Sequence, residues 1–310
     1  MRAVDPWSEA IITAMDSVRP AVVNVQAVTP SDNSVALGSG VVVDYHHVVT
    51  TAQIAAKDDE VTITTADGKS YGATVLGLDP LYFLAVLKTD RRLQVELPTF
   101  CKSEQIRPGQ VVVAVGNAFG DYNVTTGVVS AADRTIYRPE RFPVDGLVIT
   151  DAAVHPGNVG GALAWLDGQI VGLAGIPWSQ GLGLAVEGEV VARVANQIID
   201  YGEATHPWLG FSGQQQVVEK VMADLFSLPS NRGLLVNHVA DSGPGSKAGV
   251  EEGDLILSCQ GRPVSTVGQI RRIMSLRQPG ETVTLTAFRG SELVELQLPV
   301  EQMPRLTARE

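Results

Sequence analysis

The interpretation of the whole chain starts from one stretch, Thr150-Asp151-Ala152-Ala153-Val154-His155-Pro156-Gly157-Asn158-Val159-Gly160-Gly161-Ala162-Leu163. Its glycines stand on both sides of Asn158 and Val159. Glycine is needed where a backbone turns sharply and where N–H groups must approach another group without a Cβ in the way. The stretch therefore predicts a sharply turning loop that presents backbone N–H groups.

Composition narrows the class of protein. The chain has 310 residues, which predicts about two domains, and its 23 basic and 34 acidic residues give a net charge of −11. This charge argues against nucleic acid or an anionic membrane surface as partner, because both need a basic face. No apolar run approaches the roughly 18 residues of a membrane span.

The cysteines and the N-terminal residues give two separate expectations. Cys101 and Cys259 are far apart, and we expect two unpaired, small apolar residues. Without a CxxC motif, a thiolate metal site is not expected. Residues 1–6 do not form a signal peptide, which predicts a cytoplasmic protein if the chain is complete. The alternative is a periplasmic or other extracytoplasmic location, with an export segment missing.

Hydrophobic patterns divide the chain. Trp7, Ile11, Met15 and Val18 share one face of a short helix, docked on its own chain or forming an oligomer contact. Short strands with glycine turns then predict a sandwich or a pair of barrels, and a helical stripe follows at 190–201. The rest mixes strands with helical patterns at 217–226 and 265–276. The expected boundaries are a helix over 1–20, domains over 21–204 and 206–302, and a tail over 303–310.

Four segments, taken together, resemble the HtrA/Deg family, in which a trypsin-like serine protease domain precedes a PDZ domain. They are Gly38-Ser39-Gly40-Val41-Val42, Asp79-Pro80 with Leu84 to Lys88, Gly116-Asn117-Ala118-Phe119-Gly120, and Thr150 to Leu163. They lie between residues 38 and 163, and the segments 206–211 and 241–254 resemble the PDZ domain of this family. The resemblance implies a mainly β protein, with a trypsin/chymotrypsin-like double β-barrel followed by an α+β PDZ domain. It also implies a trimer built on the protease domains.

The three catalytic positions of this family hold other residues here. A trypsin-like protease needs a serine nucleophile, a histidine base and a carboxylate that orients the histidine. Gln53 stands at the histidine position, Phe83 at the aspartate position and Val159 at the serine position. Glutamine is no base near neutral pH, and valine is no nucleophile. Gly157, Asn158 and Val159 are then a remnant of the oxyanion loop, and no catalytic residue is predicted.

Histidine side chains suggest one alternative chemistry. His155 lies near the loop, and the pair His46-His47 precedes a strand, so a metal site is conceivable. A histidine in a turn is more often solvated or hydrogen-bonded. We therefore expect neither a metal nor another cofactor.

The domain expected over residues 206–302 contains a pattern that predicts a binding site. Trp208-Leu209-Gly210-Phe211 matches the x-Φ-Gly-Φ loop with which PDZ domains bind a partner's terminal carboxylate. Ile270, Ile273 and Met274 lie on the helix that would form the other wall. The alternative is that these apolar residues belong to the core, and we expect this for Ile270. These residues favour binding of peptides or protein C-termini.

Three hypotheses for the function follow. The first is a proteolytically inactive HtrA-like protein that binds peptides as a scaffold, a chaperone-like protein or a regulator. It would act as a homo-trimer or in a mixed oligomer with an active relative. The second is an active HtrA-type serine endopeptidase in protein quality control, as family membership alone suggests. The third is a small-molecule or metal-binding protein that reuses the old cleft.

Overall fold

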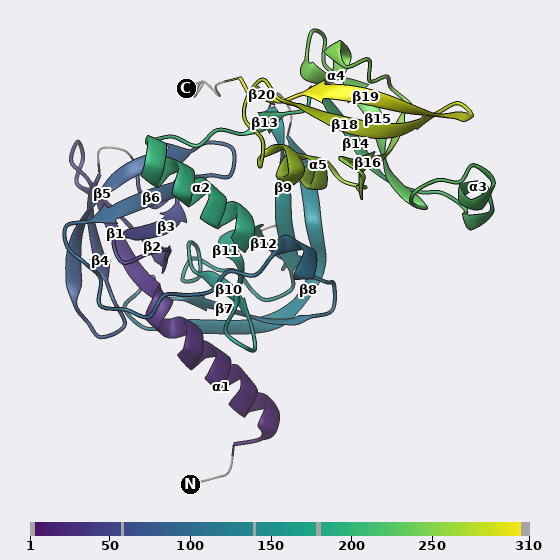
Figure 1. Cartoon of the computed structure of the whole chain (residues 1–310). Helices are drawn as coiled ribbons and strands as arrows, with labels where there is room; N and C mark the ends of the chain where they lie inside the picture. Colours follow the sequence, from purple (N-terminus) through teal and green to yellow (C-terminus); the bar gives the residue numbers. More distant parts are fainter. Residues whose placement is uncertain (1–3, 57–58, 139–140, 178–180, 305–310) are drawn as a thin grey trace. The chain divides into compact units, whose positions relative to one another are not determined.

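The computed structural model describes residues 4–56, 59–138, 141–177 and 181–304. The chain divides into two compact units, one of residues 1–132 and 146–204, the other of residues 133–145 and 205–310. Strands dominate both units (Figure 1). The expectation of a mainly β protein is confirmed.

The first unit begins with a closed barrel whose strand order is β1-β2-β3-β6-β5-β4. Its strands are β1 (Val22–Thr29), β2 (Ser34–Val42), β3 (His47–Thr51), β4 (Glu60–Thr64), β5 (Ser70–Asp79) and β6 (Leu84–Thr89). The alternation in β4 buries Val61 and Ile63 and exposes Glu60 and Thr62, as a strand with one buried face requires. Val25, Val48 and Leu87 complete the barrel's interior.

A second closed barrel follows, with the strand order β10-β11-β12-β9-β8-β7. Its strands are β7 (Val111–Gly116), β8 (Asn123–Arg138), β9 (Arg141–Thr150), β10 (Ala162–Trp165), β11 (Ile170–Pro177) and β12 (Gly183–Glu187). Val112, Leu163 and Val171 lie in its core. Two antiparallel barrels in tandem are the architecture that the sequence predicts for this part of the chain.

Two helices pack on the barrels. Helix α1 (Pro6–Val18) is capped by Asp5, whose carboxylate accepts hydrogen bonds from the N–H groups of Trp7 and Ser8. It buries Ala14 and Val18 and extends away from the barrels (Figure 1), so Trp7 stays half exposed. Short 3-10 turns lie at Arg19–Ala21 and Ser103–Gln105.

Helix α2 (Gly188–Tyr201) joins the two barrels. It contacts β5 and β6 of the first barrel and β11 and β12 of the second. Its Ile198 lies so close to Gly77 on β5 that a Cβ there would overlap the isoleucine side chain. Gly202 ends the helix with a φ of 80°, and its N–H donates to the Ile198 carbonyl.

The second unit has a sheet of strand order β14-β15-β16-β18-β19, with β17 paired to β16 and a separate pair β13-β20. Its strands are β13 (Pro207–Trp208), β14 (Phe211–Val217), β15 (Arg232–Val239), β16 (Leu255–Cys259), β17 (Arg262–Pro263), β18 (Thr282–Arg289), β19 (Glu292–Pro299) and β20 (Glu301–Gln302). Its helices are α3 (Lys220–Leu225), α4 (Pro244–Lys247) and α5 (Val267–Met274). The helix expected over 217–226 is shorter than predicted, because β14 continues through Val217.

Charged groups tie this unit together. Arg289 binds Asp254 through two hydrogen bonds of 2.7 and 2.8 Å, and it also donates to Glu251 and to the Gly249 carbonyl. Asp254 is buried, and the bidentate pair with Arg289 compensates its charge. Arg271 on α5 is buried against Asp145, which belongs to the same unit.

Both cysteines are free and buried, as expected. Burial raises the pKa of the Cys101 thiol to about 12 and that of Cys259 to about 11. Almost no thiolate therefore exists at pH 8, and the thiolate is the reactive form.

We expect the native protein to resist Ellman's reagent at pH 8 and both thiols to react on unfolding in urea. The unfolded thiols lose their protons first as pH rises, so the cysteines lower the free energy of unfolding between about pH 8.5 and the folded pKa values. Rapid labelling of the native protein at pH 8 would contradict the burial of these groups.

Candidate functional sites

The turns that hold Gln53 and Phe83 lie next to each other. Strands β3 and β6 pair with Thr51 opposite Leu84, and the pairing continues as the Ala52 N–H donates to the Phe83 carbonyl over 2.8 Å. Gln53 follows β3 and is exposed, whereas Phe83 precedes β6 and is partly buried. The backbone thus places these two positions as neighbours at one end of the first barrel.

The turn before Phe83 has an unusual backbone. The buried carboxylate of Asp79 accepts hydrogen bonds from the N–H groups of Leu81 and Tyr82, which fixes the turn. Phe83 then adopts a φ of 55°, in the left-handed region that bulky residues rarely occupy. Aspartate and asparagine tolerate this region better. The backbone of this turn therefore suits a short polar side chain.

Val159 is linked to the first barrel although it belongs to the second. Its carbonyl accepts a hydrogen bond from the N–H of Ser39 on β2, at 2.9 Å. Its side chain is partly buried and packs against the apolar core of the first barrel, which includes Ile54, the residue after Gln53. Val159 therefore contacts the same barrel that carries Gln53 and Phe83.

Buried polar groups hold the loop around Val159. Asn158 is buried, and its side-chain amide donates to the Ala114 carbonyl. The Ser39 hydroxyl donates to the Gly157 carbonyl and accepts from the N–H of Asn117. Gly160 has a φ of 81°, and a Cβ there would overlap the Ser39 carbonyl oxygen. The glycines of this loop are thus required by packing and conformation, whatever the chemistry of Val159.

The side chain of His155 accepts a hydrogen bond from one backbone N–H of the loop. In trypsin-like proteases the oxyanion hole consists of the N–H of the nucleophile and the N–H of the glycine two residues before it, here Val159 and Gly157. The Gly157 N–H donates to Nδ1 of His155 at 3.1 Å, and the Asn158 N–H donates to the His155 carbonyl at 2.8 Å. One potential oxyanion donor is therefore bound by the chain itself.

Phe83 provides a test of the site's electrostatics. Asp and Asn at this position lose the same apolar ring and both suit the left-handed backbone, so their difference isolates the charge. We expect Phe83→Asp to be less stable than Phe83→Asn by about 1 kcal/mol at pH 7, because the neighbouring Gln53 offers no cation; partial exposure keeps the cost below that of a fully buried charge. Equal urea midpoints for the two variants would show that an unpaired charge at position 83 does not destabilise the protein.

The loop Trp208-Leu209-Gly210-Phe211 lies at the head of β14. Gly210 has a φ of 71°, and a Cβ there would press on Pro244 at the start of α4. Its carbonyl accepts a hydrogen bond from the N–H of Ala240, whereas the N–H groups of Leu209 and Gly210 have no partner in the described part of the chain. Unpaired amides at such a glycine can bind a carboxylate.

The side chains around these amides are anchored. Leu209 and Phe211 are buried in the core of the second unit. The Trp208 ring meets the Phe142 ring edge-on, with centroids 6.3 Å apart, within the same unit. The loop is therefore held by its side chains, and its free N–H groups belong to a fixed backbone.

An edge strand and a helix adjoin this loop. Among the described strands, β14 pairs with β15 alone, so it is the end strand of its sheet. On α5, Ile273 is partly buried, whereas Met274 is wholly buried in the core beside Ile270. Met274, which the sequence analysis placed on the binding groove, is thus a core residue in the structure, and Ile273 is left to line the wall.

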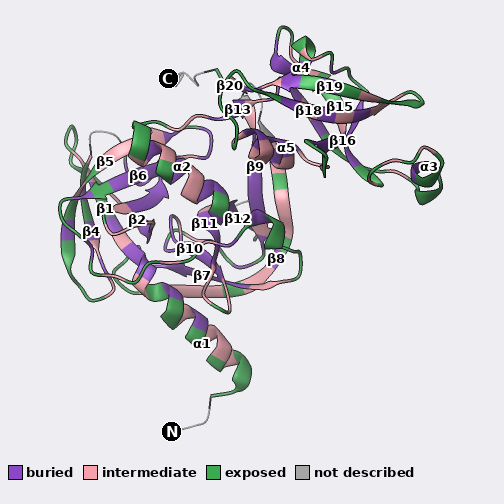
Figure 2. Cartoon of the chain, in the orientation of Figure 1, coloured by how far each residue is buried: buried purple, intermediate pink, exposed green. Residues whose placement is uncertain are grey.

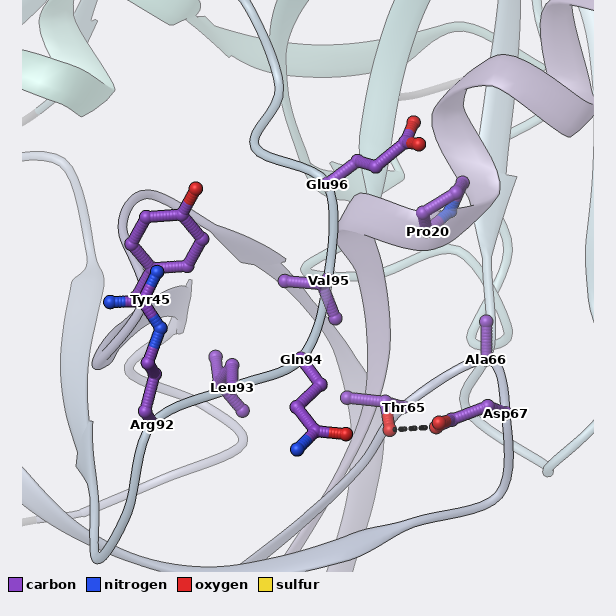
Figure 3. A pocket seen from close by; sticks show the side chains of 10 residues that line it. All are labelled: Pro20, Tyr45, Thr65, Ala66, Asp67, Arg92, Leu93, Gln94, Val95 and Glu96. Atoms are coloured by element: carbon purple, nitrogen blue, oxygen red, sulfur yellow. Dashed lines mark hydrogen bonds between the residues drawn. The ribbon is translucent and has the colours of Figure 1, made fainter.

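A pocket of about 490 Å³ opens elsewhere on the first barrel (Figure 3). It is lined by Pro20, Tyr45, Thr65, Ala66, Asp67, Arg92, Leu93, Gln94, Val95 and Glu96. Arg92 stacks on Tyr45 at 3.7 Å, and Asp67 accepts a hydrogen bond from Thr65. Gln53, Phe83 and Val159 are not part of it.

The histidines offer no assembled metal site in the described ranges. No group of three His, Cys, Asp or Glu side chains there could hold a metal ion. His47 is engaged with Asp44 at 2.8 Å. Nor does any helix in these ranges combine the length and apolar character that crossing a bilayer requires.

Two closed antiparallel barrels, linked by the hydrogen bond between Ser39 and Val159, agree with a trypsin-like peptidase fold, and the family model of the trypsin-like peptidase domain matches residues 38–173. The PDZ domain model matches residues 210–300. This combination identifies the class of protein. The chain belongs to the HtrA/Deg family.

Curated relatives agree with this assignment. A protein of Chlamydia muridarum named probable periplasmic serine endoprotease DegP-like is 34% identical over 271 residues, which are 86% of this chain and 52% of the relative. A protein of the same name from Halomonas elongata is 31% identical over 283 residues, 88% of this chain and 58% of the relative. The chain thus spans about half the length of the curated relatives it matches.

Solved structures are similar over almost the whole chain. The HtrA-type protease AlgW with a tripeptide has a TM-score of 0.71 and 28% identity, covering 96% of this chain and 98% of that one. The serine endoprotease from Yersinia pestis has a TM-score of 0.63 and 25% identity, covering 95% and 98%.

The comparisons correct the expected location. The relatives from Chlamydia muridarum, Halomonas elongata and Ectopseudomonas mendocina are named periplasmic serine endoproteases. They point to the periplasm, so the expectation of a cytoplasmic protein is wrong. That expectation rested on residues 1–6, which do not have the pattern of a signal peptide.

Proposed function

We propose that this chain is a proteolytically inactive HtrA-like protein that binds peptides or protein C-termini through residues 208–211, β14 and Ile273. The observation that carries the proposal is the pair of N–H groups of Leu209 and Gly210, which have no partner in the described part of the chain and lie at the head of β14, the end strand of its sheet. A ligand's terminal carboxylate would bind these amides, and its last residues would pair with β14 as an added strand. The role would be that of a scaffold, a chaperone-like protein or a regulator.

The first unit supports the absence of proteolysis in this proposal. Neither Gln53 nor Val159 can replace the group its position needs, since one is no base and the other no nucleophile. Loss of the serine or the histidine alone costs about a millionfold in rate in subtilisin. Without the catalytic side chains, the scaffold and oxyanion donors leave a rate acceleration of about 10³–10⁴ over the reaction in water. This acceleration is too small for a protease.

A matched pair of ligands tests peptide binding. A library of C-terminal peptides is screened against the full chain, and the best binder is then compared with the same peptide bearing a C-terminal amide. We expect the amide to bind at least about tenfold more weakly, because it lacks the charge that the loop amides bind. If the two forms bind equally, carboxylate capture at this loop is not the function.

The rival function is an active HtrA-type serine endopeptidase. The names of the relatives favour it, since they are called endoproteases or proteases. A casein and peptide cleavage assay separates the two functions. Cleavage that copurifies with the wild-type chain and disappears in the Val159→Ala variant would establish the rival and end our proposal of inactivity.

Assembly is a separate part of the proposal. We propose a homo-trimer or a mixed oligomer with an active relative, in which α1 takes part. Trp7 and Ile12 on this helix are about half exposed, and such apolar side chains suit a contact between chains. Light scattering at several concentrations should give a mass above that of one chain, and the double variant Trp7→Glu with Ile12→Glu should reduce it. A monomer at every concentration would refute self-assembly.

A further inference from the structure

The pocket of about 490 Å³ on the first barrel is bordered by segments that hydrogen bonds hold in place. Residues 92–96 follow β6, a strand that is buried almost throughout (Figure 2). Leu93 is buried, and its N–H donates to the Tyr45 carbonyl at 2.7 Å. Lys69, just before β5, donates to the side chain of Gln94 at 2.8 Å. The pocket therefore has a fixed frame, so a ligand binds without the cost of ordering a loop.

Among the described residues that line this pocket, Asp67, Arg92 and Glu96 are charged, and the first of them is neutralised within the chain. Asp67 pairs with Lys69 at 2.7 Å and accepts a hydrogen bond from the Thr65 hydroxyl at 2.6 Å. These contacts with Lys69 and Thr65 lower the pKa of the Asp67 carboxyl to about 2. The charge of Asp67 is thus balanced before any ligand binds.

The other two charges have no ion-pair partner in the part of the chain that the structure describes. The Arg92 guanidinium stacks on the Tyr45 ring at 3.7 Å, which fixes its direction, and its N–H groups have no acceptor among the described residues. Glu96 is exposed and lies at the other end of the same segment (Figure 3). Four residues of chain span at most about 14 Å. The pocket therefore has a cation at one end and an anion at the other, within reach of a short ligand.

Apolar side chains supply another part of the lining. Pro20, Ala66 and Val95 are partly buried, so each leaves some apolar surface exposed. Val95 also packs on the apolar core of the first barrel, which holds it in position. A ligand that covers these side chains gains from removing apolar surface from water. The pocket thus suits a ligand with two opposite charges and an apolar group between them.

We propose that this pocket binds a short peptide of three or four residues with free ends. The terminal carboxylate binds Arg92, the terminal ammonium binds Glu96, and an apolar side chain between them contacts Pro20 and Val95. An extended tripeptide spans about 10 Å, so it reaches both charges, whereas a free amino acid reaches only one. The site is separate from the loop at 208–211, because it needs both ends of the ligand.

The tripeptide Ala-Leu-Ala tests the proposal on the isotope-labelled full chain. The amide resonances of residues 93–96 report on the pocket, and those of Leu209 and Gly210 report on the carboxylate loop. We expect the first group to shift on titration. N-acetylation and C-terminal amidation should each weaken this binding about three- to fivefold, as the loss of one exposed charge pair predicts. Free leucine should bind at least about tenfold more weakly than the tripeptide.

Variants assign each end of the peptide to one side chain. In Arg92→Gln the tripeptide should lose the same factor as on amidation, and amidation should then have no further effect. Glu96→Gln should behave in the same way towards acetylation. Arg91→Gln is the matched control, because Arg91 stacks on Tyr71 at 4.9 Å and donates to the Ser70 carbonyl, outside the described lining. It should leave the affinity unchanged. Melting temperatures verify that all variants fold.

The outcomes separate this site from the carboxylate loop. Shifts confined to Leu209 and Gly210 would support the function proposed for that loop and overturn the pocket as a peptide site. The proposal is also wrong if acetylation and amidation leave the affinity at residues 93–96 unchanged. Equal losses in Arg91→Gln and Arg92→Gln would mean that the general charge of this surface, and not the pocket, attracts the peptide.

Discussion

A variant carrying Gln53→His, Phe83→Asp and Val159→Ser should hydrolyse peptide substrates only weakly, and adding His155→Ala should raise its rate about 10²–10³-fold. The first three changes restore the side chains that a trypsin-like site requires. They do not release the Gly157 N–H, which donates to His155 Nδ1. Removal of one oxyanion-hole donor costs about this factor in kcat. The imidazole thus acts as an internal acceptor where a substrate oxygen should bind.

The experiment compares kcat for a peptide ester and a peptide amide in the triple and the quadruple variants. His155→Ala alone serves as control and should remain inactive, since it supplies neither nucleophile nor base. The amide nitrogen and proton resonances of Gly157 give a readout independent of activity and should shift when His155 is removed. A triple variant as active as the quadruple one would show that substrate binding releases this amide without help.

Gly210→Glu should abolish binding of C-terminal peptides, with a loss of at least about 100-fold in affinity. The backbone at Gly210 has a φ of 71°, and the new Cβ would press on Pro244, so the loop must move. The added carboxylate would also repel the terminal carboxylate of the ligand at close range. These two effects act on the same pair of loop amides, and together they leave no favourable position for the ligand.

A second glycine provides the matched control. Gly261 also has a φ of 71°, but a Cβ there would meet nothing within 4 Å. Gly261→Glu therefore has the same backbone strain and the same added charge in an open turn. We expect it to lower the melting temperature modestly and to leave peptide affinity within about twofold of the wild type. Equal loss of binding in both variants would mean that the loss reflects stability alone.

Much of this molecule could be predicted from its sequence, because glycine and strand patterns report backbone geometry. The loop at Gly157 to Gly161 and the loop at Gly210 are both visible as glycines in fixed spacings, and the structure has left-handed backbone at Gly160 and Gly210. The alternation in β4 and the turn at Gly290 between β18 and β19 are equally local signals. Such features depend on a few adjacent residues.

Other features depend on residues that are distant in sequence. Phe83 gives no sign of a left-handed backbone, which follows from the Asp79 turn and the pairing of β3 with β6. The helical period of α5 does not tell which apolar residue faces the core and which a groove, so Met274 was misplaced. Arg271 is a charged residue that is buried in an ion pair with Asp145. Because Asp145 lies 126 residues earlier, no local pattern indicates this pair. His155 was considered as a metal ligand, whereas it binds a backbone amide two residues away.

Helix α2 also has a consequence for how the protein folds during synthesis. It is the last element of the first unit in the sequence, and it contacts strands of both barrels. The apolar face formed by Val190, Val191, Val194 and Ile198 has to cover barrel surface that is exposed until this segment leaves the ribosome. A chain stalled before residue 188 would therefore present an uncovered apolar strip to chaperones, and the two barrels would become one cooperative folding unit only after Gly202 emerges.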